Sequence, residues 1–384
     1  MPERCLRGRR VASFQTVSPV LSQITRGATV AVIRLRSLGD TVLTTPALAL
    51  LKRHRPDLRV VIVLEKPFDE VVEGNPDVSS VISLEPGAGL WARYEALIAI
   101  RRAQPSLCLN LHGGSTSAWL TAFSGARFRA GFEYFRPALA YNVRIPRAQG
   151  ILGRDENHRD DDDRDENDRD ENDRDDNRGP DEGHSDNDPV HTAEHHASAM
   201  FHLGVPVADT PRAVLDAGRS SREKPYAVLH VSAAYFTKQW PAERFRGVAT
   251  SIRDKHGLEP VMIAGPGESE ILREFSDFES LDGLSIRALK SLLAGARLFV
   301  GNDSGPAHIA AAFGVPCVVV FGSSNSAVWR PWQTDHEVVE TDWDCKPCPG
   351  DRCYAFDQPR CILSVEAEQV ENAVGRLLAS AKAL

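Results

Sequence analysis

The chain has 384 residues, of which 42% are hydrophobic and 26% are charged. This length and composition are typical of a globular protein with two domains. The longest apolar runs are the size of strands, well below the roughly 18 residues of a membrane-spanning helix. The arginine-rich start also lacks the continuous apolar segment of a signal peptide. We therefore expect a cytoplasmic protein whose residues 1–26 form a flexible extension.

The net charge of −8 hides an uneven distribution, because residues 154–188 hold 18 Asp and Glu against 6 Arg. Five-residue repeats without apolar side chains cover much of this segment, which cannot offset the entropy cost of ordering. We expect a disordered insertion or, as the alternative, a tail that binds a partner. The other residues include 35 acidic and 39 basic ones, a balance that suits an anionic ligand. Basic and aromatic residues are not interleaved as on nucleic-acid-binding surfaces, so we expect no nucleic-acid partner.

Residues 27–153 alternate between apolar strands and helical patterns. The predicted elements, in chain order, are a strand at 29–35, a helix from Thr41 to about His54, a strand at 59–64, a helical stretch near Asp69, a strand at 78–84, a helix at 90–103 and a strand at 107–111. Strands separated by helices predict a parallel, doubly wound sheet. This segment therefore forms the first expected domain.

A second alternating pattern begins after a helical or linker segment at 189–224. Within residues 225–364 the predicted elements are strands at 227–231, 260–264, 297–300 and 317–321, and helices at 241–256, near 269–275, at 286–296 and up to Gly314. The fold class is thus α/β, with two Rossmann-like domains. We expect the amphipathic segment 365–384 to form a helix that crosses back to the first domain.

The loop Gly301 to Gly305 leads from a strand into a helix that begins at Ser304-Gly305-Pro306. The unpaired N–H groups and the positive dipole end of such a helix bind phosphate well. Ligands of doubly wound sheets also lie beyond the carboxyl ends of the strands. The loop therefore indicates a phosphorylated ligand, although an ordinary crossover helix would have the same sequence pattern.

Two further loops place charged residues at carboxyl ends of strands. Asp40 follows the first strand, where it could accept a proton or simply form the N-cap of the next helix; spacing alone favours the cap. Lys238 follows Ser232 and Thr237 in a loop of the second domain, where it could face a phosphate. A solvated loop lysine is the alternative.

Four motifs taken together resemble glycosyltransferase family nine, the ADP-heptose:lipopolysaccharide heptosyltransferases. The motifs are IRLRSLGDTVLTTPA from Ile33 to Ala47, KQWPAERF from Lys238 to Phe245, AGPGE from Ala264 to Glu268 and GNDSGPAHIAA from Gly301 to Ala311. The resemblance covers nearly all of residues 28–379. It implies the GT-B architecture, in which two Rossmann-like domains face a cleft, with the donor on the second domain and the acceptor approached from the first.

The resemblance also implies roles for individual residues. Asp40 matches the general base of an inverting transfer that needs no metal ion, and Arg36, Ser37 and Gly39 lie on the acceptor side. The donor-binding positions would be Ser232, Thr237, Lys238, Glu268, Asp303, Ser304, Gly305 and His308. For His308, packing beneath the loop is the competing role. The partners would be ADP-heptose and a lipopolysaccharide core acceptor.

Peripheral contact with the inner membrane is a further expectation, with Lys52, Arg53 and Arg55 as basic contacts for anionic lipid or a phosphorylated acceptor. Three alternatives stay open. The same scaffold could use another nucleotide sugar for a different cell-surface glycan, bind a nucleotide sugar without turnover, or act as a nucleotide-sugar epimerase.

Four of the seven cysteines fall within residues 345–361, at Cys345, Cys348, Cys353 and Cys361. This density suits a closed structural zinc site with four thiolate ligands. Free or reversibly oxidised thiols are the alternative. We expect no cofactor to be required for catalysis.

Overall fold

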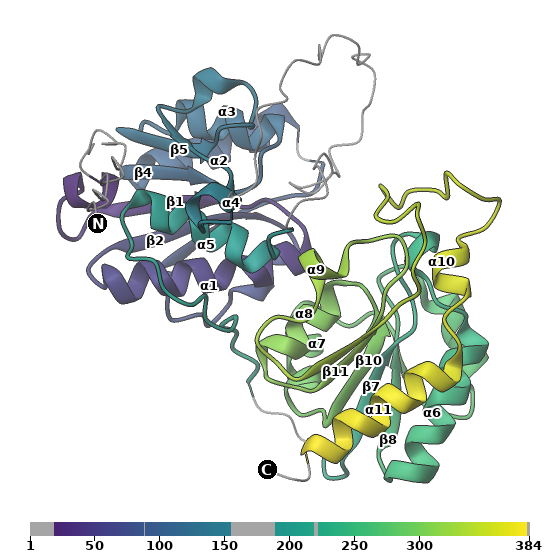
Figure 1. Ribbon diagram of the computed structural model, residues 1–384. Coiled ribbons are helices and arrows are strands. Elements are labelled where there is room, and N and C mark those ends of the chain that lie inside the picture. The colour runs from purple at the N-terminus through teal and green to yellow at the C-terminus, as the bar shows by residue number, and fades with distance from the viewer. Residues whose placement is uncertain (1–18, 88, 155–188, 219–221, 382–384) are drawn as a thin grey trace, which may run out of the picture.

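The computed structural model describes residues 19–87, 89–154, 189–218 and 222–381. Within these residues the chain forms two six-stranded sheets whose strand pairs are all parallel (Figure 1). The acidic segment lies outside the described residues from position 155 to 188. Among the described helices, none combines the length and apolar composition needed to span a bilayer.

The two sheets have the same strand order. The first runs β3-β2-β1-β4-β5-β6 and the second β9-β8-β7-β10-β11-β12, so each has the Rossmann order 3-2-1-4-5-6 when its own strands are counted. The first-sheet strands are β1 Thr29–Ile33, β2 Arg59–Glu65, β3 Ser80–Leu84, β4 Pro105–Asn110, β5 Phe128–Phe132 and β6 Val143–Ile145. The second-sheet strands are β7 Tyr226–His230, β8 Glu259–Ile263, β9 Glu279–Leu281, β10 Leu298–Asn302, β11 Cys317–Val320 and β12 His336–Val339. The predicted pair of Rossmann-like domains is confirmed.

Helices cover both faces of the first sheet. Helices α1 (Leu38–His54) and α5 (Thr192–Leu203) pack together on one face, while α2 (Leu90–Arg102) and α3 (Ser115–Phe123) pack together on the other. The alternation of β1 separates the two cores, because Val30 and Val32 join the cluster with α1 and α5, whereas Ala31 and Ile33 join the cluster with α2 and α3. Helix α5 therefore belongs to the first domain. The linker to the second domain begins after it.

The second sheet is covered in the same way. Helices α6 (Ala242–His256) and α11 (Ala367–Ala381) share one core with alternate residues of β7 and β10. Helices α7 (Ile286–Ala294) and α8 (Gly305–Ala312) pack on the opposite face. The core between α7, α8 and the second sheet is continuous with the core of α1 and α5, because α8 also packs against α1. Short helices complete the structure: α4 Ala148–Ile151, α9 Ser326–Trp329, α10 Arg360–Leu363 and the 3₁₀ segments Val20–Gln23, Phe68–Val71, Ala138–Ala140, Phe236–Lys238 and Ser269–Phe275.

Two predictions about the chain ends are wrong. The C-terminal helix α11 does not cross back to the first domain; its buried residues Val370 and Val374 pack with α6 and the second sheet, and Figure 1 shows α11 lying beside α6. Residues 19–26 are not a loose extension, because Leu21 and Ile24 are buried in the first core and Arg55 donates to the carbonyl of Leu21. The rest of the predicted extension, residues 1–18, lies outside the described residues.

Candidate active site

The carboxyl edges of the two sheets meet where the first turns of α1 and α8 touch. A Cβ atom on Gly39 would lie 2.7 Å from Cδ2 of His308, and one on Gly305 would lie 2.6 Å from Cδ2 of Leu38. Real side chains do not approach so closely, so only glycine fits at either position. The contact brings Asp40 of the first domain close to the Gly301–His308 loop of the second.

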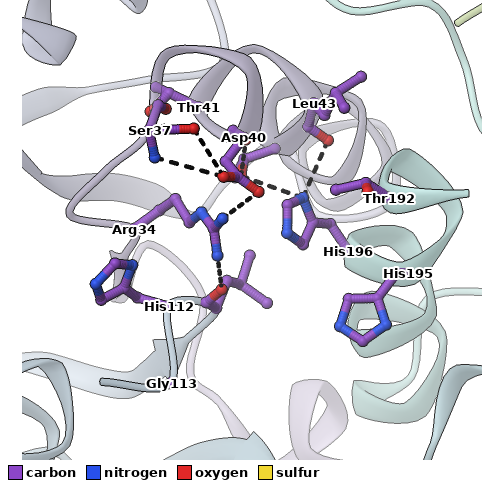
Figure 2. A network of polar contacts seen from close by, with 12 residues as sticks. Arg34, Ser37, Asp40, Thr41, Leu43, His112, Gly113, Thr192, His195 and His196 are labelled. Atoms are coloured by element: carbon purple, nitrogen blue, oxygen red, sulfur yellow. Dashed lines mark hydrogen bonds and ion pairs between the residues drawn. The ribbon is translucent and has the colours of Figure 1, made fainter. Parts of the chain in front are cut away.

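Asp40 is buried beside an equally buried arginine. Its Oδ1 forms an ion pair with the guanidinium of Arg34, which in turn donates to the backbone carbonyl of Leu111. Its Oδ2 accepts a 2.9 Å hydrogen bond from the Ser37 hydroxyl (Figure 2). The imidazole of His196, from α5, lies on the far side and contacts the carbonyl of Leu43. The carboxylate is thus held by Arg34 and Ser37, both from its own domain.

The predicted start of α1 at Thr41, with Asp40 as its N-cap, is wrong. The helix begins at Leu38, Ser37 is the N-cap, and Asp40 occupies the third helical position in a capping box with Ser37. The reciprocal bonds satisfy N–H groups at the helix start, and the carboxylate complements the positive end of the dipole. The first turn of α1 therefore carries its own anion.

The pKa of Asp40 reflects two opposed effects. Burial raises the pKa of this carboxyl. The positive charge of Arg34, with smaller contributions from His196 and Ser37, lowers the pKa by more than burial raises it, so the pKa of Asp40 lies below its usual value. Asp40 is consequently ionised at neutral pH. An ionised carboxylate at this edge of the sheet can accept a proton.

A pocket of about 190 Å³ opens on the first domain, where Leu35 and Arg36, the residues that follow Arg34, form part of its lining. It lies at the carboxyl ends of β1 to β4, and its lining residues include Leu35, Arg36, Glu65, Arg93, His112, Ser115 and Thr116. Burial and the charge of Arg34 lower the pKa of His112 to about 3, so its ring is neutral at physiological pH. The predicted acceptor-side residue Arg36 therefore lines a real pocket. Ser37 and Gly39 instead shape the start of α1.

On the second domain, Asp303 joins two predicted donor-side elements. Its Oδ2 accepts a 3.0 Å bond from Lys238 and a 2.5 Å bond from the Ser324 hydroxyl. Lys238 is therefore not the isolated cation that the sequence suggests, because an internal carboxylate partly neutralises it. A phosphate would compete with Asp303 for this ammonium group.

His230, which the sequence analysis did not single out, connects three loops at the end of β7. Its Nδ1 lies 2.9 Å from the hydroxyl of Ser304, and its Nε2 lies 3.4 Å from that of Ser232. Ser232 in turn accepts a 2.8 Å bond from the N–H of Gly265. Burial lowers the pKa of His230 to about 4, so the ring acts as a neutral hydrogen-bonding bridge. The only sequence signal for this role is a polar residue at the end of an apolar strand.

The start of α8 differs from that of α1. Ser304 is the N-cap, yet its side chain makes no capping hydrogen bond because it is turned toward His230, and no acidic residue lies in the first turn. Pro306 supplies no N–H and the N–H of Ala307 donates to the Ser304 carbonyl, whereas the N–H of Gly305 has no side-chain acceptor among the described residues. The positive end of α8 is thus left for an external anion.

His308 lies at the contact between the domains and not beneath the loop. Its ring abuts Gly39, and its buried Nδ1 has no hydrogen-bond partner among the described residues. Burial lowers the pKa of His308, and the opposing effects of Asp303 and Asp40 show that both carboxylates are near it. His308 is thus a buried, packed residue of α8, and its contact with a donor stays a prediction. The imidazole is aimed between the two domains.

Two other predicted donor residues occupy different positions. Glu268 is half-buried, and its carboxylate lies against Gly265 in the loop that follows β8. Thr237 is buried, and its hydroxyl is bonded to the Gly350 carbonyl and to the Ser323 hydroxyl. The structure thus shows Thr237 anchoring the cysteine-rich segment, and direct contact with a donor stays a prediction for both residues.

The four clustered cysteines line a single small pocket of about 30 Å³, together with Thr237 and Ser323. All four thiols are free, and the N–H of Cys348 donates to the Ser323 carbonyl. In the described part of the chain, however, no group of three or more His, Cys, Asp or Glu side chains is placed to hold a metal ion. The donor chemistry fits zinc, but the arrangement of the thiols as it stands does not.

Taken together, the two sheets, the buried carboxylate of the first domain and the open helix start of the second define a two-domain transferase of the GT-B type. The solved structures with this fold include a family 9 glycosyl transferase from Veillonella parvula, with a TM-score of 0.69 and 20% identity over 92% of this chain and 97% of the other. The structure of the E. coli ADP-heptose lipopolysaccharide heptosyltransferase II gives a TM-score of 0.67 with 16% identity, over 92% and 99% of the two chains. The predicted architecture is confirmed.

Sequence comparison identifies the family. Residues 194–355 match Glycosyltransferase family 9 (heptosyltransferase). The chain is 25% identical to lipopolysaccharide heptosyltransferase 3 of E. coli over 90% of its own length and 98% of that protein. It is 23% identical to lipopolysaccharide heptosyltransferase 1 of Pseudomonas aeruginosa, over 88% and 92%. Residues 194–355 therefore match the family 9 glycosyltransferase domain, and the similarity to lipopolysaccharide heptosyltransferases extends over most of the chain.

The contact of the cysteine-rich segment with the donor-side loop can be tested at Gly350. This residue has a φ of +86°, and a Cβ would lie 3.1 Å from the Ser323 hydroxyl, 3.5 Å from that of Thr237 and 3.7 Å from Lys238. We expect Gly350→Ala to displace the loop that carries Lys238 and to weaken ADP binding several-fold in calorimetry. Gly283→Ala is the matched control, because its φ is +60° but nothing lies within 4 Å of the added carbon. Equal ADP affinity in the two variants would contradict the contact.

Proposed function

We propose that this protein is an inverting heptosyltransferase that moves heptose from ADP-heptose to an acceptor in the lipopolysaccharide inner core. The observation that carries the proposal is the placement of Asp40 opposite the open N-terminus of α8, across the contact between Gly39 and His308. Similarity to lipopolysaccharide heptosyltransferases over about nine-tenths of the chain supports this choice of donor and acceptor.

The reaction is a single displacement. An acceptor hydroxyl attacks the anomeric carbon of the heptose, and its proton passes to the carboxylate of Asp40. The bond between that carbon and the ADP oxygen breaks, and ADP leaves with the electron pair. Attack from the face opposite the leaving group inverts the configuration. The ionised state of Asp40, maintained by Arg34, suits it to receive the proton.

Charge develops on the pyrophosphate as ADP departs. The first-turn N–H groups of α8, which lack a side-chain cap, would donate hydrogen bonds to its oxygens, and the ammonium of Lys238 would supply a positive charge. Fixed dipoles stabilise such charge without reorganising during the reaction. We therefore propose that the transfer step itself proceeds without a metal ion.

The acceptor would occupy the pocket lined by Arg36, Arg93 and His112 on the first domain. This pocket is adjacent to Asp40 and lies on the opposite domain from the proposed donor site, as a displacement across the cleft requires. The reaction would take place at the cytoplasmic face of the inner membrane, in peripheral contact with it.

The general-base role is tested by Asp40→Asn, with transfer from ADP-heptose to a core oligosaccharide measured by mass spectrometry. We expect kcat to fall by about 10² to 10⁴, because the amide cannot accept the proton. ADP affinity should not change, since Asp40 lies on the other domain. Ser37→Ala is the control: it removes a cap contact worth about 1 kcal/mol but keeps the carboxylate. Full activity of Asp40→Asn would refute the assignment.

Arg34→Gln tests how the carboxylate is kept ionised. Without the guanidinium, burial would dominate and the pKa of Asp40 would rise. Activity requires the carboxylate, so the acid limb of the pH–rate profile should move to higher pH by the same amount. Arg34→Lys should retain most of the wild-type profile. Thermal unfolding must be followed in parallel, because breaking a buried ion pair costs about 3 to 5 kcal/mol. An unmoved acid limb in folded Arg34→Gln would contradict this role.

A structural zinc ion at Cys345, Cys348, Cys353 and Cys361 stays a prediction. The shared pocket supports it, although the thiols would have to move closer together than they are in the structure. Elemental analysis of protein purified under reducing conditions should find about one zinc per chain, and a chelator should lower the melting temperature. Metal-free protein whose melting temperature does not respond to added zinc would show that the thiols are simply free.

A further inference from the structure

An apolar surface covers the outer side of α2 and α3, away from the sheet. On α2, Leu90 is 84% exposed, Trp91 72% and Tyr94 48%; on α3, Trp119 is 39% and Phe123 53% exposed. The rings pair within each helix, with centroids 5.8 Å apart for Trp91 and Tyr94. The two helices pack together, and Figure 1 shows where they lie on the first domain. We call these five exposed residues the α2/α3 surface.

This surface is not needed for the core of the domain. The sheet side of the same helices is provided by Ala96, Leu97, Ile100 and Leu120, which are buried. Each helix therefore has a second apolar side that faces solvent. Exposed aromatic groups of this size usually mark a surface that contacts another phase or molecule.

The residue types and charges favour a lipid bilayer as that partner. Trp and Tyr are enriched at membrane–water interfaces because one end of the ring is apolar and the other polar. Exposed Arg101 and Arg102 end α2, and exposed Arg127 follows α3. Basic residues around an apolar helix surface suit anionic headgroups.

The α2/α3 surface also adjoins the proposed acceptor pocket. Arg93, between Trp91 and Tyr94 in the sequence, lines that pocket, as do Ser115 and Thr116 at the start of α3. A lipid-anchored sugar could thus enter the pocket while its acyl chains remain in the bilayer against α2 and α3. We infer that the α2/α3 surface docks this protein on an anionic bilayer.

Of the three basic contacts expected from the sequence, Arg53 is exposed, whereas Lys52 and Arg55 are engaged within the first domain. Lys52 donates to the carbonyls of Pro56 and Leu58, and Arg55 pairs with Asp57 and with carbonyls of residues 21 to 25. Both side chains serve to hold the first domain together.

Sedimentation of the full-length protein with vesicles tests the inference. Wild-type protein should bind vesicles of phosphatidylglycerol and phosphatidylethanolamine, and bind pure phosphatidylcholine more weakly. The double variant Leu90→Ser, Trp91→Ser should lose affinity for the anionic vesicles by about tenfold or more, since it removes two large apolar side chains. Val207→Ser, Tyr354→Ser is the control, because it removes one aliphatic and one aromatic side chain that are 69% and 55% exposed elsewhere. This control should bind as wild type.

Three results would overturn the inference: wild-type protein that does not bind anionic vesicles, equal binding to both vesicle types, or equal weakening in the two double variants. Self-association that Leu90→Ser, Trp91→Ser abolishes, without vesicle binding, would assign the surface to a second copy of the chain. The orientation of the protein on the bilayer rests on the proposed acceptor. Transfer to a water-soluble core oligosaccharide tests the proposed function separately from membrane binding. The double variant should retain transfer to it, whereas failure of the proposed function would remove transfer in wild type and leave vesicle binding intact.

Discussion

The close approach of two helix starts determines the rest of the site. Helix α1 of the first domain and α8 of the second meet through Gly39 and Gly305, where no side chain would fit. Two positive helix ends would ordinarily repel each other and attract the same anion. Here α1 is neutralised internally by Asp40, whereas the cap residue of α8 is turned away toward His230. The pair therefore has one open anion site and one fixed carboxylate within the same cleft.

Buried polar groups maintain this asymmetry. Arg34 counteracts the effect of burial on Asp40, and His230 holds Ser304 away from the helix that it would otherwise cap. Such groups are costly to bury unless they are paired, so each one fixes a particular local geometry. The donor side depends on a similar network, because Asp303 links Lys238 to Ser324 and Thr237 links the same loop to Gly350.

The repeated strand and helix pattern was sufficient to predict both Rossmann-like sheets, because buried parallel strands are continuous apolar runs such as Val60 to Leu64. It missed four short strands that are partly exposed and lack that signal: β5 and β6 of the first sheet, and β9 and β12 of the second. It also started α1 three residues late. Gly39 and Asp40 have low helix propensity, and only the capping box with Ser37 shows that they are helical. The side on which α11 packs depends on partners far away in the sequence.

The sequence by itself determined the architecture, the family resemblance and the candidates Asp40, Lys238 and the Gly301–His308 loop, because strand periodicity and helix starts are local properties of the chain. Only the tertiary structure decided which charges are paired. It placed Arg34 against Asp40 through the turn that leads into α1, and it brought Asp303 to Lys238 and Ser304 to His230 across 65 and 74 residues, separations that no local pattern encodes. It also decided that Lys52 and Arg55 are internal contacts and that the aromatic residues of α2 and α3 face outward, since burial depends on how distant segments pack.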